Sequence, residues 1–189
     1  MANPQVEALL IEAGAIMRGH FLLTSGRHSD IYVEKFRILE RPDVVQTLAS
    51  EIAAFFRTQG VTIVAGPTTG GILLAFEVAR QMGLSSLYIE TENGQKTLRR
   101  SAVVPAGAKV GIVDDVLTTG RSVVESMEAI SRFAGEVVAV GVLIDRTESD
   151  PGFGVPWMAC HQVSATSYPA NDIPDWLAEI PISKPGTRV

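Results

Sequence analysis

The sequence has a single cysteine, Cys160, among 189 residues. One cysteine cannot form a disulfide within the chain, and its neighbours Ala159 and His161 come without further ligand residues at the spacing of a metal site. We therefore expect a buried, unreactive thiol in a protein of a reducing compartment.

Positive charge is also scarce. The chain has 16 Lys and Arg against 21 Asp and Glu, a formal net charge of −5, and no basic run that would bind DNA or RNA. It also lacks an apolar run near the ~20 residues that a membrane span needs. The first twenty residues include Glu7 and Glu12 rather than the basic start of a signal peptide. We expect a cytoplasmic protein without nucleic-acid or membrane partners.

Two common phosphate-binding motifs are missing. There is no GxxxxGK[ST], which excludes the usual nucleoside triphosphatase loop, and no GxGxxG, which excludes the usual dinucleotide-binding fold. What is present is 46% hydrophobic residues, enough to form the core of one compact domain.

Apolar strands alternate with amphipathic helices along the middle of the chain. Pro42 suits a first helical turn and Gly60 a helix end, which predicts a helix at 42–59. Further helices are expected at 71–83 and 122–135, and strands at 61–66, 86–91, 109–115 and 136–146. This order predicts an α/β fold with a central, mainly parallel sheet and helices on both faces. We expect residues 1–189 to form a single domain, with a core at about 42–150 and a small hood from about 1–40 and 152–189.

The strongest functional signal is VGIVDDVLTTGRS at residues 110–122. It places Asp114 and Asp115 at the end of an apolar strand, where ligands bind in open parallel sheets. The loop from Thr118 to Ser122 then enters a helix whose free N–H groups and positive dipole end attract an anion. Such a site suits a ligand with hydroxyls or a metal on one side and a phosphate on the other. The alternative is an ordinary helix cap beside solvated acids.

A second turn between a strand and a helix, AGPTTGG at 65–71, offers small residues that let backbone N–H groups approach a pyrophosphate. Its candidate contacts are Thr68, Thr69 and Gly70. Taken alone, a glycine-rich turn is also a common simple connection.

The acids followed by the phosphate loop resemble the signature of type I phosphoribosyltransferases, which bind phosphoribosyl pyrophosphate (PRPP). Within that family, GHFLLTSGRHSDIYVE at 19–34 resembles the GxFxLxSGxxSxxY segment of orotate phosphoribosyltransferases, and IDR at 144–146 resembles their strand-end arginine. The similarity runs from about residue 10 to about residue 170. It implies a transferase of pyrimidine biosynthesis that makes orotidine 5′-monophosphate and pyrophosphate from PRPP and orotate. It also implies Mg²⁺ as cofactor and a homodimer.

Carried over by position, the resemblance assigns two sets of residues. Asp114 and Asp115 are the catalytic acids, and they meet the ribose hydroxyls or, through water, the Mg²⁺ held mainly by PRPP. The implied PRPP contacts are Asp114, Asp115, Val116, Leu117, Thr118, Thr119, Gly120, Arg121, Ser122, Thr68, Thr69, Gly70, Lys96, Arg99 and Arg100. The implied orotate contacts are Ser25, Gly26, Arg27, Tyr32, Thr118 and Arg146. Two alternatives stay open: SGR is also a common polar turn, and Arg146 can pair with Asp145 or Glu148 at the surface.

The chain departs from the family pattern in three places. Many members have lysine where this chain has Thr24, and again where it has Gly70. Their mobile loop carries Arg, Lys and His, whereas the corresponding stretch here, 90–107, keeps its cations but has no histidine. Closure of that loop is expected to exclude water, which competes as a nucleophile. Two other functions stay open: a phosphoribosyltransferase for another nucleobase, and a PRPP-sensing homologue with weak catalysis.

Overall fold

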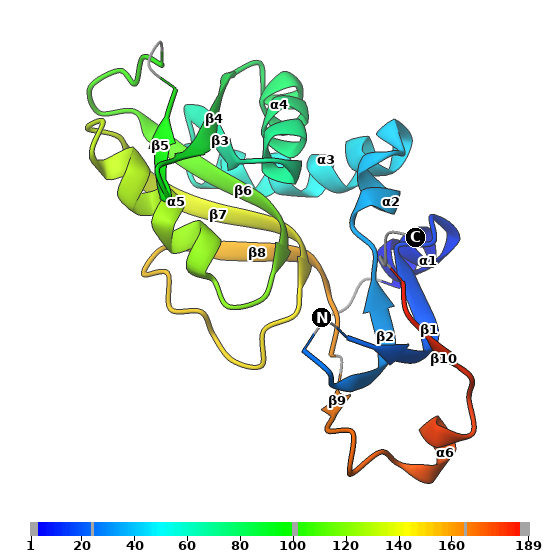
Figure 1. The fold of residues 1–189 in the computed structure, drawn as a ribbon. Coiled ribbons are helices and arrows are strands. Elements are labelled where there is room, and N and C mark those ends of the chain that lie inside the picture. Colours follow the sequence, from blue (N-terminus) through cyan, green and yellow to red (C-terminus); the bar gives the residue numbers. More distant parts are fainter. Residues whose placement is uncertain (1–3, 24, 100–101, 165, 186–189) are drawn as a thin grey trace.

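The computed structural model describes residues 4–23, 25–99, 102–164 and 166–185. These residues form a sheet of six strands, covered by helices, and a smaller sheet of four strands beside it (Figure 1). In Figure 1 the middle of the chain, from cyan to yellow, builds the larger part, while the blue and red ends of the described chain gather at the smaller sheet.

The larger sheet has the order β5-β4-β3-β6-β7-β8. Its strands are β3 (Ile63–Pro67), β4 (Ser85–Glu92), β5 (Gln95–Leu98), β6 (Lys109–Leu117), β7 (Glu136–Asp145) and β8 (Trp157–Gln162). Neighbouring strands pair in parallel, except that β4 and β5 form an antiparallel hairpin. The predicted mainly parallel sheet is therefore confirmed.

Three helices cover this sheet: α3 (Pro42–Thr58), α4 (Gly70–Met82) and α5 (Arg121–Ser131). Buried residues of α3 and α4 pack with Val113 of β6, whereas those of α5 pack with its neighbour Ile112. Successive residues of a strand point to opposite faces, so α3 and α4 lie on one face and α5 on the other. The predicted helical cover on both faces is confirmed.

Helix α3 lies directly on the backbone of the sheet. Pro42 occupies its first turn, and Phe56 and Ile52 are fully buried. A Cβ on Gly111 of β6 would come within 2.4 Å of Phe56, and one on Gly141 of β7 within 2.6 Å of Ile52. These two glycines leave the room that the helix fills.

The smaller sheet, the hood, has the order β10-β1-β2-β9. Its strands are β1 (Ile16–Leu22), β2 (His28–Val33), β9 (Ser167–Tyr168) and β10 (Ile182–Ser183), and the helices α1 (Pro4–Glu12) and α6 (Asp175–Ala178) contact β1. The short helix α2 (Phe36–Leu39) follows β2 and contacts α3 and α4 of the larger part. Two buried histidines join its parts: His20 Nε2 lies 2.6 Å from His28 Nδ1, and His20 Nδ1 lies 3.1 Å from the carbonyl oxygen of Ile180.

The structure corrects three expected boundaries. Strand β8 falls within 152–189, the stretch expected in the hood, yet it pairs with β7 as the edge of the larger sheet. The stretch 90–107, expected as a loop, contains the end of β4 and all of β5. Strand β6 runs to Leu117, two residues beyond its expected end at Asp115. The acids therefore lie within β6, as predicted, and the strand continues for two residues beyond them.

The predicted burial of Cys160 is confirmed. Its thiol is free and packs within 3.4 Å of the carbonyl oxygen of Leu48, and burial raises its pKa. Among the helices in the described ranges, none combines the length and the apolar character needed to cross a membrane.

Candidate active site

Asp114 and Asp115 are held on β6 by backbone hydrogen bonds. The N–H of Asp115 donates to Asp114 Oδ1 at 2.9 Å, and the N–H of Val116 donates to Asp115 Oδ1 at 2.7 Å. Both residues are buried, with exposed fractions of 8% and 5%. Neighbouring strands fix this segment, because Asp114 is in register with Val142 of β7.

The two carboxyl groups stand in different electrostatic surroundings. Burial and, after it, the charge of Asp115 raise the pKa of Asp114, while a hydrogen bond with Ser122 opposes the shift. Asp115 instead has a cation within contact distance, because Lys35 Nζ lies 2.8 Å from its Oδ2. The site thus pairs one carboxyl whose pKa is raised by burial with one that forms an ion pair with a lysine.

The predicted phosphate loop joins β6 to α5. Thr118 and Thr119 are exposed, and Gly120, the residue before the helix, has φ +76°. A Cβ on Gly120 would also lie 3.2 Å from Phe153 and 3.3 Å from Pro151. Glycine is therefore suited to this position by conformation and by space. The loop leads the chain into the N-terminus of an 11-residue helix, the end that attracts anions.

Val116 and Leu117, implied as PRPP contacts, continue the strand. The N–H of Val116 is bound to Asp115, the Leu117 side chain is buried in the core, and the Leu117 carbonyl accepts from Arg146 N–H at 2.8 Å. At the other end of the motif, Arg121 is exposed and its Nε donates to Glu125 at 2.6 Å.

The hairpin of β4 and β5 brings a lysine to the start of α5. Lys96 Nζ donates to Ser122 Oγ at 2.6 Å. Burial lowers the pKa of Lys96, while the charges of Asp114 and Glu125 oppose that shift. The structure thus places Lys96 beside Asp114 and the start of α5, although it comes from the hairpin of β4 and β5.

The second predicted loop joins β3 to α4. Thr68 and Thr69 are exposed, Gly70 is buried, and the Thr68–Thr69 peptide bond is cis. Thr68 and Arg99 line one cavity of about 550 Å³, together with Glu90, Thr91, Glu92, Thr97 and Leu98. Arg99 also donates to the Tyr88 hydroxyl at 2.8 Å. The structure brings Thr68 and Arg99 together, while Arg100 and Thr24 lie outside the described residues.

Arg146 lies where the end of β7 meets the phosphate loop. Its N–H donates to Leu117, the residue before Thr118, and its charge opposes the rise in the Tyr32 pKa that burial and Glu34 cause. Its buried Nε has no hydrogen-bond partner among the residues that the structure describes. The structure therefore brings Arg146 near Thr118 and Tyr32, with one buried donor that no described residue satisfies.

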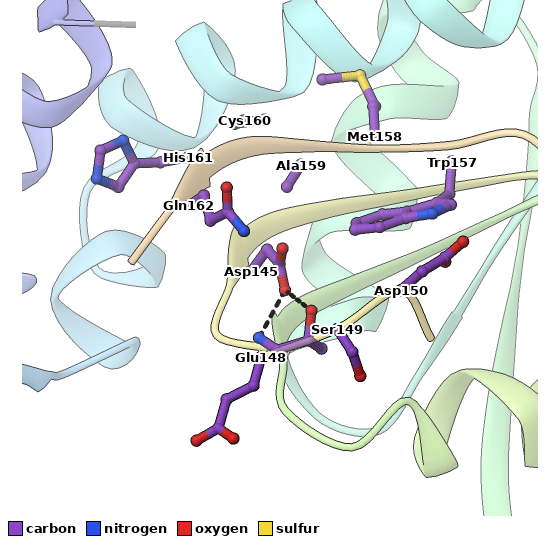
Figure 2. A pocket seen from close by; sticks show the side chains of 11 residues that line it. Asp145, Glu148, Ser149, Asp150, Trp157, Met158, Ala159, Cys160, His161 and Gln162 are labelled. Atoms are coloured by element: carbon purple, nitrogen blue, oxygen red, sulfur yellow. Dashed lines mark hydrogen bonds between the residues drawn. The ribbon is translucent and has the colours of Figure 1, made fainter. Parts of the chain in front are cut away.

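The surface ion pair considered for Arg146 is not found. Asp145 accepts instead from Thr147, at 2.8 Å from its N–H and 2.7 Å from its hydroxyl (dashed in Figure 2). No ion pair of Arg146 with Asp145 or Glu148 occurs in the described part of the chain.

Figure 2 shows a second cavity, of about 420 Å³, beside the edge strand β8. Trp157 and Asp150 flank it on one side, and Met158 points from β8 toward a helix on the other. No residue assigned to PRPP or orotate lines this cavity. Its lining residue Asp145 is in register with Leu117, so the cavity adjoins the end of β6 that carries the acids.

Three of the residues implied to contact orotate lie in the turn between β1 and β2. Ser25, Gly26 and Arg27 are exposed, and Gly26 has φ +77°. Arg27 reaches away along the hood: its Nε donates to Ser167 Oγ at 2.8 Å and its Nη2 to the Ser167 carbonyl. In this structure Arg27 therefore ties the turn to β9. Tyr32 lies on β2 against Phe21, with ring centroids 5.6 Å apart.

Sequence reasoning missed Lys35, which reaches Asp115 from the start of α2. One signal for it was present in the sequence: Lys35 directly follows the segment 19–34 that we assigned to the orotate site, and residues next to such a segment are candidates for contact with the site.

Comparison with known proteins gives a single family. Residues 37–151 match the phosphoribosyl transferase domain. The chain is 43% identical over 188 residues to the orotate phosphoribosyltransferase of Desulforamulus reducens, covering 100% of this chain and 98% of that protein. It is 39% identical over 183 residues to the orotate phosphoribosyltransferase of Thermotoga maritima, covering 97% and 98%.

Solved structures show the same fold. The orotate phosphoribosyltransferase of Aeropyrum pernix superposes with a TM-score of 0.70 at 27% identity, covering 84% of this chain and 93% of that one. The adenine phosphoribosyltransferase of Thermoanaerobacter pseudethanolicus gives a TM-score of 0.62 at 17% identity, covering 70% and 88%. The second likeness concerns the fold alone.

Proposed function

The chain belongs to the phosphoribosyl transferase domain family, and from this premise we propose that it is an orotate phosphoribosyltransferase. It transfers the phosphoribosyl group of PRPP to orotate, giving orotidine 5′-monophosphate and pyrophosphate in pyrimidine biosynthesis. Similarity to relatives of that name over the whole chain supports the assignment. The structural observation that carries it is Arg146, whose unpartnered buried Nε beside the phosphate loop suits an anionic base.

PRPP binds along the carboxyl ends of β3 and β6. The 5-phosphate rests at the start of α5, where Gly120 lets the loop turn and backbone N–H groups face the anion. Asp114 and Asp115 meet the ribose hydroxyls. The pyrophosphate lies toward the β3–α4 turn and the cavity shared by Thr68 and Arg99. Lys96 adds positive charge between these two ends.

We propose Mg²⁺ as the cofactor, carried mainly by PRPP. No group of three or more His, Cys, Asp and Glu in the described ranges is arranged to hold a metal ion. Two adjacent carboxylates fit an ion that keeps its waters and is bound mostly through substrate phosphates. Asp114 and Asp115 would reach it through water, and when bound it supplies charge that offsets that of the leaving pyrophosphate.

The residues of the chain act on both charges of the reaction. A ring nitrogen of orotate attacks the anomeric carbon, the bond from that carbon to pyrophosphate breaks, and the nitrogen gives up its proton to water. Positive charge develops on the ribose, where the carboxylates of Asp114 and Asp115 stabilise it. Negative charge develops on the pyrophosphate, near Lys96 and Arg99.

The base is selected by its carboxylate. Orotate differs from uracil by that group, and Arg146 offers a charge-assisted hydrogen bond in a partly buried place. A site built for the carboxylate should reject a base without it by roughly 10³-fold or more, because its donor would stay unpaired.

Incubation with Mg²⁺, PRPP and one of four bases tests the function. Orotate should yield its mononucleotide, and uracil, hypoxanthine and adenine should not. A reaction with hypoxanthine or adenine and none with orotate would refute the base assignment while leaving PRPP chemistry intact. PRPP binding without transfer to any base would identify a sensing protein instead.

The homodimer and the cytoplasmic location stay predictions from the resemblance and the composition. Light scattering coupled to size exclusion would measure the first. A mass of one chain, 20.2 kDa, would contradict it.

A further inference from the structure

Lys35 connects the hood to a core acid. It follows β2 and directly precedes α2, so it lies on the segment that leads from the smaller sheet to the larger one. Its Nζ is 2.8 Å from Asp115 Oδ2, and the Asp115 side chain is only 7% exposed, against 39% for Lys35. Because water screens a partly buried pair less than an exposed one, this contact can hold the carboxylate in place.

The carboxylate of Asp115 is fixed at both oxygens. Oδ1 accepts from the N–H of Val116 at 2.7 Å, and Oδ2 meets Lys35. Of these two contacts, the backbone one is set by β6 itself. Lys35 therefore supplies the one of these two contacts that a substitution can remove, and the orientation of the carboxylate depends on it.

The glycine at position 70 leaves the space that this orientation needs. A Cβ on Gly70 would lie 2.0 Å from Asp115 Oδ2 and 2.9 Å from its Cγ. It would also lie 3.0 Å from Leu39, at the end of α2, the helix that Lys35 precedes. Gly70, Asp115 and the Lys35–α2 segment thus form one contact, in which a larger residue at 70 would push the carboxylate away from Lys35.

Each acid has its own lysine. Lys96 approaches Asp114 from the hairpin by way of Ser122, and Lys35 approaches Asp115 from the hood. Two adjacent buried carboxylates repel each other, and this repulsion contributes to the raised pKa of Asp114. A cation on Asp115 reduces the cost of keeping both acids in one site.

We infer that Lys35 is a positioning residue for phosphoribosyl transfer, which orients Asp115 toward the ribose of PRPP and for which Gly70 provides the room. The inference rests on the proposed function, since it takes Asp115 to act on PRPP. Many family members have lysines at the positions of Thr24 and Gly70 in this chain, and the proposed positioning lysine, Lys35, lies at neither position.

Steady-state kinetics of Lys35→Met test it, because methionine keeps the length of the side chain and removes the charge. The variant should lose about 10-fold in kcat/KM for PRPP, as expected for a misplaced catalytic group, with the KM for orotate within about 2-fold of wild type. Lys35→Arg, which keeps the positive charge, should retain most of the wild-type kcat/KM for PRPP. The matched control is Arg37→Gln, which removes an exposed cation that pairs with Glu40 on α2, the helix that Lys35 precedes.

A double-mutant cycle with Gly70→Ala distinguishes the positioning role of Lys35 from a role in stability alone, because only a shared contact makes the two losses in turnover non-additive. Gly70→Ala should itself reduce turnover, because its Cβ displaces Asp115 from Lys35. In that background Lys35→Met should cost less than about 3-fold, since the contact is already lost. If the losses in kcat/KM of the two single variants multiply in the double variant, the inference is overturned. Wild-type kinetics of Lys35→Met would overturn it as well. So would equal losses in kcat/KM for PRPP and for orotate accompanied by a lower Tm.

The two proposals fail in different ways. If the wild-type protein binds PRPP in calorimetry but transfers it to no orotate, the proposed base is wrong. Lys35 is then judged on PRPP affinity alone: a loss of about 10-fold in Lys35→Met supports the positioning role, and unchanged affinity overturns it.

Discussion

The two sheets of this protein contribute to the site in different ways. The six-stranded sheet presents the acids and the phosphate loop on one continuous segment, residues 114–122, fixed by β6 before it and α5 after it. The hood is assembled from both ends of the chain, with His20 contacting Ile180 across 160 residues and Arg27 contacting Ser167 across 140.

This difference indicates a division of labour. A continuous segment between a buried strand and a helix is rigid, which suits the fixed chemistry of ribose and phosphate. Short strands held by long-range contacts can change with less effect on that chemistry, which suits the recognition of one base among several. Damage to the core segment should therefore affect turnover and PRPP, and damage at the base end should affect orotate alone.

The largest effect is expected from Asp114→Asn combined with Asp115→Asn. Both side chains keep their size, but the charge that stabilises the developing positive ribose is lost, so turnover should fall by about 10²-fold or more. The measurement is kcat with both substrates saturating. The surface pair Asp172→Asn and Asp175→Asn serves as the control, since both residues are exposed. Equal rates for the core double variant and the wild type would refute the role of the acids.

Arg146→Ala should separate the base end of the site from its PRPP end most clearly, even though Arg146 follows β7 of the larger sheet and the turn between β1 and β2 lies in the hood. A charge-assisted hydrogen bond to the orotate carboxylate is lost, so the KM for orotate should rise about 10- to 100-fold, with the KM for PRPP within about 2-fold. Initial rates with each substrate varied in turn measure both constants. Arg80→Ala, which removes an exposed arginine paired with Glu77 on α4, is the control. An equal rise for PRPP would break the proposed division.

Gly120→Val should have the opposite signature and a smaller effect. Valine at φ +76° is strained, and its Cβ would come within 3.2 Å of Phe153, so the loop shifts and PRPP affinity falls by about 10-fold. Calorimetric titration with PRPP measures it. Gly154→Val has the same kind of strain, at φ +72°, with nothing near its Cβ, and should bind PRPP normally. Unchanged PRPP affinity in a folded Gly120→Val protein would contradict the site.

The same division explains what the sequence could predict. Helix α3 was predicted closely because Pro42 and Gly60 mark its ends, and the acids were placed with the phosphate loop because all of them lie on one short segment. Strand β5 was missed because Gln95–Leu98 is short and mostly polar, without the alternation that indicates a strand. Strand β8 was assigned to the hood because nothing local distinguishes an edge strand of one sheet from a strand of the other.

Contacts between distant segments were beyond local reasoning. The Lys35–Asp115 pair and the Arg27–Ser167 contact join residues that no periodicity relates. The role of Gly70 as space for a carboxylate likewise depends on where β6 lies against α4, which only the assembled fold determines. Predictions from sequence succeeded for the central strands and helices of the core, whose signals are local, and were incomplete for the edge strands β5 and β8 and for contacts between distant segments.

The smallest expected effect concerns stability and compares the core acid with a surface acid near the hood. The pKa of Asp114 is raised above 3.8 in the folded chain, mainly by burial and then by Asp115. The folded state therefore binds this proton more tightly than the unfolded state. Its contribution to stability is most favourable below pH 3.8 and is lost as the pH rises through the raised pKa.

Asn at 114 removes the cost of ionising a buried carboxyl and can still accept the bond from the N–H of Asp115. Asp114→Asn should thus raise the Tm at pH 7 by about 2 °C, and the gain should vanish well into the acid range. Asp172→Asn, the same charge change at an exposed position, should leave the Tm unchanged at both pH values. Thermal unfolding of the two variants across this range decides the matter, and a lower Tm for Asp114→Asn at pH 7 would mean that its carboxylate stabilises the core it was expected to strain.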